Sequence, residues 1–264
     1  MAALPKARIG LIGGTGVYDP GLFKNVKRVS LHTPYGPTSD DIEVGKLGGT
    51  SVAFLSRHGR GHRLPPHKVP FRANIWALKQ LGVERIISPC AVGSLKQEIK
   101  PGDIVLVDQF IDWTKNRPLT FYDGPKTVHI SAADPFCAQL IKLFHGAAKR
   151  LKLKARAGGT YLCIEGPRFS TRAESRMFRQ WADVIGMTLV PEAQLAREME
   201  MCYLSLATST DYDVWANKPV TAEVILRVLD MNVANSRSLI AEALPKIPAR
   251  RTCACRKALA GAEL

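Results

Sequence analysis

A strand–helix–strand segment from Asp183 to Asp213 constrains the fold of this chain more than any other stretch. The first strand ends in a Met-Thr pair, a short helix opens at a glutamate, and a mostly apolar run at 203–207 suits a buried second strand. In α/β sheets, ligands collect beyond the carboxyl ends of the strands. We therefore expect five side chains to face one pocket: Met187, Thr188, Glu192, Asp211 and Asp213.

The net charge of +14 raises the possibility of nucleic-acid binding. The basic residues, however, are spread along all 264 positions, and no aromatic residues interleave with them in a binding motif. A solvated basic surface with an anion site is the interpretation we favour, so we expect no nucleic-acid partner. The first residues contain no long apolar run, and no stretch is long and apolar enough to span a bilayer. These features predict a cytoplasmic protein with no membrane partner.

Two polar loops directly follow apolar strands and have the composition of an anion site. The first is the glycine-rich turn at 10–16, where backbone N–H groups and the Thr15 hydroxyl can surround an oxyanion. Its glycine spacing and the break at 18–21 do not fit a dinucleotide site. The second loop contains Arg57, a planar fork for phosphate, with His58 as a further donor. A metal site at His58, His62 and His67 is the alternative, but the flanking arginines would repel a cation.

Small residues at Cys90-Ala91 end another buried strand and would let backbone amides approach a ligand. Together with the two loops above and Thr188, they predict a single phosphate site. Asp211 and Asp213 could bind the ring nitrogen and exocyclic amine of a heterocycle. A phosphate beside a sugar, with an acid beside a base, is the layout needed to cleave an N-glycosidic bond by phosphorolysis.

Strands alternate with helices along the chain, which favours a single α/β domain over 1–264 around a mixed sheet. Gly48-Gly49 predicts a hairpin between strands at 42–44 and 51–55. Apolar spacing predicts helices at 71–81 and 136–151, and Thr171 with Glu174 forms a capping box. The basic tail from about 245 is weakly patterned, and we assign it no regular structure.

The six cysteines do not by themselves imply a disulfide framework. Cys253-Ala254-Cys255 could be a redox pair, half of a metal site, or two inert thiols. The absence of a second Cys-x-Cys argues against zinc. Cys137 and Cys202 could pair, but the sequence leaves this open.

The chain resembles the methylthioadenosine phosphorylases, in the trimeric branch of the purine nucleoside phosphorylase family. The resemblance runs in order from about Ile9 to Ala243. It rests on Gly-Gly-Thr-Gly at 13–16, Arg-His-Gly-Arg at 57–60, Ala-Asn-Ile-Trp-Ala-Leu at 73–78, Gly-Ser-Leu at 93–95, Pro-Gly-Asp-Ile-Val at 101–105, Glu-Gly-Pro-Arg-Phe-Ser at 165–170, Arg-Ala-Glu-Ser at 172–175, Met-Thr at 187–188 and Thr-Asp-Tyr-Asp at 210–213. It implies a single domain with a central mixed, partly barrel-like sheet flanked by helices.

The resemblance also implies a reaction, in which methylthioadenosine and phosphate give adenine and 5-methylthioribose 1-phosphate. No cofactor is expected, because phosphate is a co-substrate. Asp211 would act as the acid at N7, and Asp213 would accept from the 6-amino group. The expected phosphate ligands are Thr15, Arg57, His58, Ala91 and Thr188, with Cys90 where relatives often have Thr or Ser. The other expected substrate contacts are Met187, Phe169, Ser170, Ala222, Ile225 and, from a neighbouring subunit, His129.

Such a chain is expected to form a homo-oligomer, either a trimer or a dimer of trimers. The alternative function is a purine nucleoside phosphorylase for adenosine or for 6-oxopurine nucleosides such as inosine, guanosine or methylthioinosine. Relatives of that kind place Asn at the base-reading position, whereas Asp213 offers only acceptors when it is ionised. A non-enzymatic nucleotide-binding module is a further alternative. The Cys-x-Cys tail is not part of the general family pattern, although similar archaeal-type members carry one with a suspected disulfide role.

Overall fold

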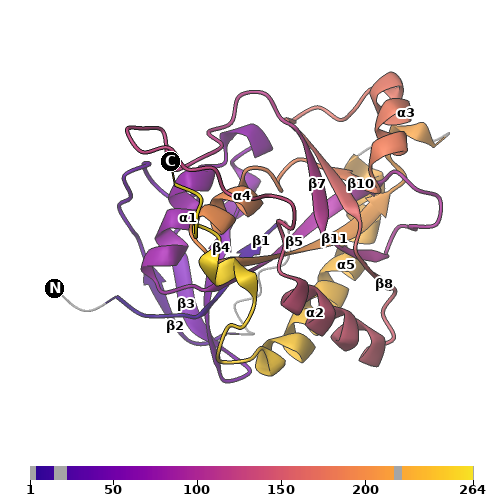
Figure 1. The fold of residues 1–264 in the computed structure, drawn as a ribbon. Coiled ribbons are helices and arrows are strands. Elements are labelled where there is room, and N and C mark those ends of the chain that lie inside the picture. The colour runs from indigo at the N-terminus through magenta and orange to yellow at the C-terminus, as the bar shows by residue number, and fades with distance from the viewer. Residues whose placement is uncertain (1–3, 15–22, 217–221, 264) are drawn as a thin grey trace.

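Two long parallel strands form the buried centre of the molecule. In the computed structural model, which describes residues 4–14, 23–216 and 222–263, these are β5 (Arg85–Ser94) and β11 (Cys202–Asp211) (Figure 1). Every residue of β11 is buried. Its side chains alternate between two hydrophobic clusters, with Tyr203 in one and Leu204 in the other, because successive residues of a strand face opposite sides of the sheet.

The described strands join into one mixed sheet, as the alternation of strands and helices predicted. The order β2-β3-β4-β1-β5-β10-β9-β7 forms its main path, while β11 pairs with β5 and β6, and β6 pairs with β8. The remaining strands are β1 (Ile9–Gly13), β2 (Lys24–Val29), β3 (Ile42–Leu47), β4 (Thr50–Ser56), β6 (Ile104–Leu106), β7 (Gln109–Trp113), β8 (Ala155–Ala157), β9 (Thr160–Ile164) and β10 (Val184–Gly186). The predicted hairpin is confirmed, and Gly48 and Gly49 occupy its turn with φ of 54° and 82°.

One edge of β5 is shared by two strands that do not meet. β1 pairs with β5 as far as Ile87, and β10 pairs with it only from Gly93 onward. In the registers of the described strands, residues 88–92 therefore have no ladder partner on that side. Pro89, which lacks an N–H, lies in this stretch. Such a divergence of neighbouring strands opens a crevice at the carboxyl end of a sheet.

Helices cover both faces of the sheet (Figure 1). α1 (Phe71–Gln80) and α4 (Glu192–Glu198) contribute to one hydrophobic cluster, and α2 (Ala138–Arg150) and α5 (Ala222–Ala243) to the other. α3 (Arg172–Trp181) packs beyond β9 and starts with the expected capping box of Thr171 and Glu174. Among the described helices, none has the length and apolar character needed to cross a bilayer.

The C-terminal tail is ordered, contrary to our expectation. Its short 3₁₀ helices, Leu244–Lys246 and Ala254–Lys257, place Leu244 and Cys255 in a hydrophobic cluster with α2 and β11. Val128 and Glu263 form an isolated β-bridge near the end of the chain. The sequence did not predict this order because basic residues dominate the tail, and only a few apolar residues and cysteines pack it against the core.

Candidate active site

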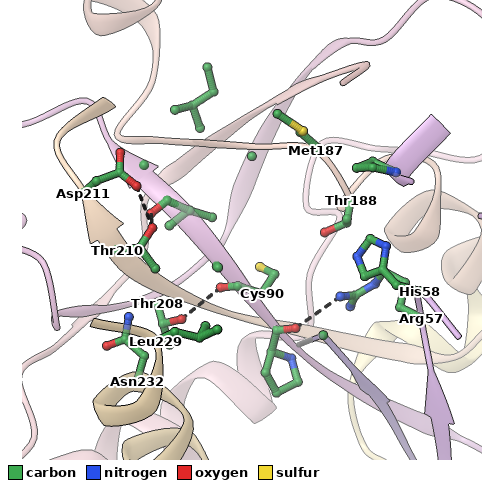
Figure 2. A pocket seen from close by; sticks show the side chains of 18 of the residues that line it. Arg57, His58, Cys90, Met187, Thr188, Thr208, Thr210, Asp211, Leu229 and Asn232 are labelled. Atoms are coloured by element: carbon green, nitrogen blue, oxygen red, sulfur yellow. Dashed lines mark hydrogen bonds between the residues drawn. The ribbon is translucent and has the colours of Figure 1, made fainter. Parts of the chain in front are cut away.

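A cavity of about 300 Å³ lies beside the unpaired stretch of β5. Figure 2 shows its two ends, with Arg57, His58 and Thr188 at one and Thr210 and Asp211 at the other. The lining residues are Gly14, Arg57, His58, His62, Pro66, Pro89, Cys90, Ala91, Val92, Gly93, Ile164, Phe169, Ser170, Ile185, Gly186, Met187, Thr188, Thr208, Thr210, Asp211, Asp213, Leu229, Asn232, Val233 and Ser236.

Arg57 follows β4 and is 1% exposed. Its Nε donates to Glu192 Oε2 at 2.8 Å, and its Nη2 donates to Glu192 Oε1 at 3.1 Å. Burial lowers the pKa of Arg57, but the Glu192 carboxylate outweighs burial, and the pKa lies above its ordinary value. Glu192 is fully buried and does not line the cavity. Our expectation that it faces the pocket is therefore wrong, because its carboxylate turns inward to Arg57.

His58 enters the cavity as a neutral imidazole. Its Nδ1 lies 2.8 Å from the Leu64 carbonyl oxygen, and its ring stacks on His62 with centroids 4.2 Å apart. Burial and the adjacent Arg57 lower the pKa of His58 from 6.5 to about 4. An Nδ1–H bond to Leu64 leaves Nε2 as an acceptor in the neutral tautomer. His67 is not among the lining residues, so the three histidines considered as metal ligands do not share this cavity.

The other expected phosphate ligands lie on β5 and after β10. Cys90 and Ala91 line the cavity within the unpaired stretch, and the Cys90 Sγ is 3.4 Å from Ser205 Oγ. Burial raises the pKa of the Cys90 thiol, so it remains protonated at neutral pH. The Thr188 N–H donates to the Tyr161 hydroxyl at 3.5 Å. Thr15, which we also expected here, lies outside the described residues.

The two aspartates at the end of β11 share the opposite end of the cavity. Asp211 accepts from the Thr210 hydroxyl at 2.7 Å and from the Asp213 N–H at 2.7 Å. Burial raises the pKa of Asp211 above its ordinary value. Asp213 accepts from Ser170 at 3.0 and 3.1 Å and also from Ser175. Asp213 lines the cavity and has a positive φ of 51°, which is uncommon for a residue other than glycine.

The structure brings most of the expected substrate contacts together. Phe169, Ser170 and Met187 line the cavity, and Phe169 is 44% exposed. α5 begins at Ala222, but the side chains of Ala222 and Ile225 lie outside the described part of the chain. His129 is exposed and is not a lining residue of this chain's own cavity, so its expected place in a neighbouring subunit's site stays a prediction.

Several lining and supporting residues were not found from the sequence. Thr208 and Thr210 alternate along β11 on the cavity side, a period-2 pattern of small polar residues that could have identified them. Residues from two helices had no comparable signal. These are Ser175 on α3, which supports Asp213, and Leu229, Asn232, Val233 and Ser236 on α5.

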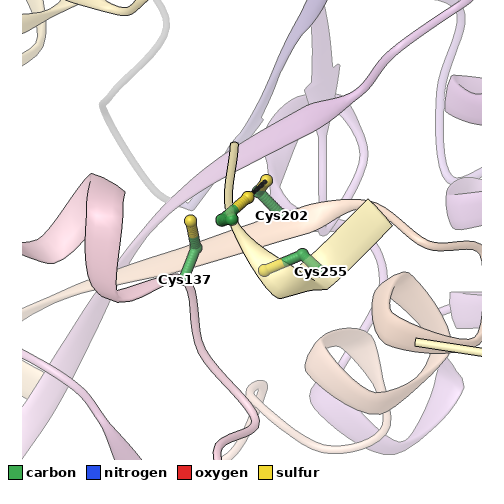
Figure 3. Close-up of side chains that lie close together, drawn as sticks. Cys137, Cys202 and Cys255 are labelled. Atoms are coloured by element: carbon green, nitrogen blue, oxygen red, sulfur yellow. Dashed lines mark hydrogen bonds between the residues drawn. The ribbon is translucent and has the colours of Figure 1, made fainter. Parts of the chain in front are cut away.

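A second cluster of chemically active groups lies where the tail meets the core (Figure 3). The sulfur atoms of Cys137, Cys202, Cys253 and Cys255 are all within 4.8 Å of one another, and Cys202 and Cys253 approach to 3.3 Å. All four are free thiols in the structure. Four thiols at this spacing could hold a soft metal ion such as zinc, and they are also near enough to form disulfides after small movements. The pairing of Cys137 with Cys202 therefore stays open.

Comparison with known proteins identifies the family of the chain. A sequence model described as the phosphorylase superfamily matches residues 8–245. This chain is a member of the phosphorylase superfamily. Its relatives include S-methyl-5'-thioadenosine phosphorylases from Pyrococcus horikoshii, 60% identical over 96% of this chain and 97% of the relative, and from Saccharolobus solfataricus, 56% identical over 96% of each.

Solved structures of phosphorylase superfamily members share the fold closely. A methylthioadenosine phosphorylase from an antarctic soil metagenomic library has a TM-score of 0.93 at 45% identity, covering 98% of this chain and 93% of that one. The methylthioadenosine phosphorylase of Schistosoma mansoni in complex with adenine has a TM-score of 0.92 at 35% identity, covering 98% and 99%. The expectations of an α/β nucleoside phosphorylase fold and of the family are confirmed.

Proposed function

We propose that this protein cleaves S-methyl-5'-thioadenosine with phosphate, giving adenine and 5-methylthioribose 1-phosphate. The observation that carries the proposal is one cavity with the Arg57 guanidinium at one end and a pair of buried carboxylates at the other. The transition state of such a reaction has oxocarbenium character. Catalysis then consists of holding phosphate near C1' while the departing base is stabilised.

Phosphate would bind at the end formed by Arg57, His58 and Thr188, next to the Cys90-Ala91 backbone. Arg57 would offer the Nη1 proton that no acceptor among the described residues takes, and Thr188 would offer its hydroxyl. Neutral His58 has an unprotonated Nε2, which suits acceptance from the P–OH of a phosphate that still carries a proton. Thr15 would complete the site. The proposed reaction needs no cofactor, because the nucleophile is phosphate, which is a co-substrate.

The purine would bind at the other end, with Asp211 at N7. The raised pKa of Asp211 favours its protonated form, which can donate to N7 as the glycosidic bond breaks. Asp213, held by two serine hydroxyls, would accept from the 6-amino group. Phe169 would flank the base, with Ser170 beside it, and Met187 would lie against the ribose.

The 5'-methylthio group would contact Ala222 and Ile225 on α5 and His129 of a neighbouring subunit. We accordingly propose a homo-oligomer, either a trimer or a dimer of trimers, in the cytoplasm. Trp113 and Trp181 support an interface, because their rings lie 5.8 Å apart while each remains more than a third exposed. Analytical ultracentrifugation would measure the assembly, and a monomer at micromolar concentration would exclude it.

Base release from methylthioadenosine, adenosine and inosine, each with and without phosphate, tests the reaction. We expect phosphate-dependent adenine release that is fastest from methylthioadenosine. Adenosine should also react, because apolar contacts typically discriminate by only about 10–200-fold. A preference for inosine would place the protein with the 6-oxopurine enzymes, and no release from any nucleoside would leave a binding module.

Asp211→Ala tests the role of the acid. Loss of a general acid typically lowers the rate by roughly 10²–10⁴-fold. The variant should still bind phosphate, because Asp211 and Arg57 lie at opposite ends of the cavity. Asp211→Asn is the matched variant, since it can donate a hydrogen bond but cannot transfer a proton. Full activity of both variants on methylthioadenosine would exclude Asp211 as the acid.

A further inference from the structure

Arg57 is held in place by a buried network that centres on Glu192. Glu192 Oε2 accepts from Arg57 Nε, while Oε1 accepts from Arg57 Nη2, from Ser88 Oγ at 2.6 Å and from the Tyr203 hydroxyl at 2.6 Å. All four residues are at most 2% exposed. The network joins the end of β4, the centre of β5, the start of α4 and the start of β11.

The remaining donor of Arg57 points to the cavity. Nη1 carries two protons, and the described part of the chain supplies it with one acceptor, the Pro89 carbonyl oxygen at 3.3 Å. A Cβ at Gly14 would lie 3.4 Å from Nη1, so the glycine places no side chain in contact with this side of the guanidinium. As far as the described residues go, the second proton of Nη1 therefore has no protein acceptor, and an anion in the cavity could accept it.

The network also cancels the charge of Arg57. Glu192 balances the guanidinium at a distance of 2.8 Å, and the neighbouring His58 has a pKa of about 4 and is neutral at physiological pH. An anion at this end of the cavity would thus meet hydrogen-bond donors such as Arg57 Nη1 with little net positive charge. The affinity then depends on the orientation of those donors, and hence on whatever fixes Arg57.

We propose that Glu192 is a positioning residue for phosphate, which clamps Nε and Nη2 of Arg57 so that Nη1 faces the anion. This inference rests on the proposed function only in taking phosphate as the anion that binds in the cavity. The opposite view, that Glu192 merely weakens the anion site by its negative charge, makes a prediction of the opposite sign. Removing its charge should weaken phosphate binding if Glu192 positions Arg57 and should strengthen it if the charge dominates.

The test is a calorimetric titration of the free enzyme with inorganic phosphate, combined with KM values for phosphate and methylthioadenosine. Glu192→Gln removes the charge with little change in shape. We expect its Kd and KM for phosphate to rise roughly tenfold to a hundredfold, the range for lost hydrogen bonds to a charged group. The KM for methylthioadenosine should change much less, a difference that general loss of structure would not produce.

Glu198→Gln is the matched control, because Glu198 is also buried on α4. Its carboxylate accepts from the Thr120 hydroxyl at 2.7 Å and the Phe121 N–H at 2.8 Å, and has no bond to Arg57. We expect wild-type phosphate affinity in this variant. If Glu198→Gln weakens phosphate binding as much as Glu192→Gln does, the effect is a general one of α4 and the proposal is wrong.

If Glu192→Gln does not fold, Tyr203→Phe tests whether the Glu192 network positions Arg57 for phosphate. It removes one of the three bonds to Oε1 and leaves both charges, so we expect phosphate affinity to fall severalfold. Unchanged or tighter phosphate binding in the folded variants would overturn the proposal. The titration needs no nucleoside. Wild-type protein that binds phosphate without releasing adenine would therefore contradict the proposed function while still testing Glu192.

Discussion

Asp211 and Asp213 are two residues apart, but their carboxyl groups have different surroundings. Asp211 lies on the last position of β11, where burial raises its pKa and favours the protonated form. Asp213 accepts hydrogen bonds from the Ser170 and Ser175 hydroxyls, which fix the orientation of its carboxylate. Two carboxyl groups in different surroundings thus line the same cavity from one end of a single strand, as the proposed roles of donor and acceptor require.

Asp213→Asn should shift the enzyme from 6-aminopurines toward 6-oxopurines. The amide offers a donor where the carboxylate offers only acceptors, and Asn tolerates the positive φ of 51° at this position. We expect the ratio of kcat/KM for methylthioadenosine over methylthioinosine to fall by roughly tenfold or more. Steady-state assays with both nucleosides measure this ratio. An unchanged ratio would mean that Asp213 does not contact position 6 of the base.

His58 should make the protein less stable as the solution becomes acidic. Its pKa is 6.5 in an ordinary environment and about 4 in the folded chain, so between these values the unfolded chain binds a proton that the folded chain does not. The free energy of unfolding therefore falls as pH drops through this window, by about 3 kcal/mol in total.

Denaturant unfolding at pH 6.5 and at about pH 4, at one protein concentration, measures this change in the free energy of unfolding. His58→Gln should lose much of the pH dependence, whereas His32→Gln, which changes an exposed histidine, should keep it. Equal slopes in wild-type protein and His58→Gln would show that other groups cause the acid sensitivity.

Most of the site could be predicted at the level of single residues because the cavity residues follow apolar strands. Arg57, Thr188 and Asp211 all lie just beyond or at the end of a strand, and ligands gather there. Glu192 shows the limit of that reasoning. It opens a helix after a strand in the same way, but its partner is 135 positions away in sequence, and only the fold decides that its carboxylate turns to Arg57.

Among the elements, β10 contains Gly186, a position where Tyr161 of the neighbouring β9 leaves no room for a side chain. A Cβ on Gly186 would lie 2.0 Å from the Tyr161 hydroxyl oxygen on β9. The same hydroxyl accepts from the Thr188 N–H, so a displacement of Tyr161 should also disturb Thr188 in the cavity.

Gly186→Ala should therefore lower both stability and phosphate affinity. Overpacking of this kind typically costs about 1–3 kcal/mol. Gly146→Ala on α2 is the matched control. Its Cβ would have its nearest neighbour at 3.6 Å, and alanine in a helix should stabilise the protein by about 0.5–1 kcal/mol. Thermal unfolding and phosphate titration compare the two. Similar effects of both substitutions would contradict the predicted clash.

The helices and the β3–β4 hairpin could be predicted because local patterns determine them. The helix at Phe71–Gln80 has apolar spacing, and the hairpin has its Gly-Gly turn. The unpaired stretch of β5 could not be predicted. It exists because β1 and β10, more than 170 residues apart in sequence, pair with different parts of one strand. Local sequence carries no signal for such long-range pairing.

For the whole molecule, the C-terminal tail is an integral part of the hydrophobic core. Cys255 is buried against residues of α2 and β11, and Cys253 lies beside Cys202. The sequence alone did not predict this contact, because basic side chains dominate the tail and only a few apolar atoms fix it in place.

Changing Cys253 and Cys255 together to serine should lower the midpoint of thermal unfolding by several degrees. Buried sulfur is replaced by a smaller polar group, and about 1 kcal/mol corresponds to roughly 2–4 °C in a chain of this size. Calorimetry in the presence of a reductant measures the shift. Lys257→Ser, at an exposed tail position, should leave the midpoint unchanged, as should the cysteine change if the tail contributes nothing.

β11 has Cys202, which lies beside Cys253 of the tail, at one end and Asp211 at the other. Nine residue steps separate Cys202 from Asp211, or about 30 Å of extended chain. The tail contact and the Asp211 carboxylate therefore lie at opposite ends of one buried strand. Substitutions in the tail and at the Asp211 end should therefore act almost additively, provided that they leave Tyr203 and its bond to Glu192 unchanged.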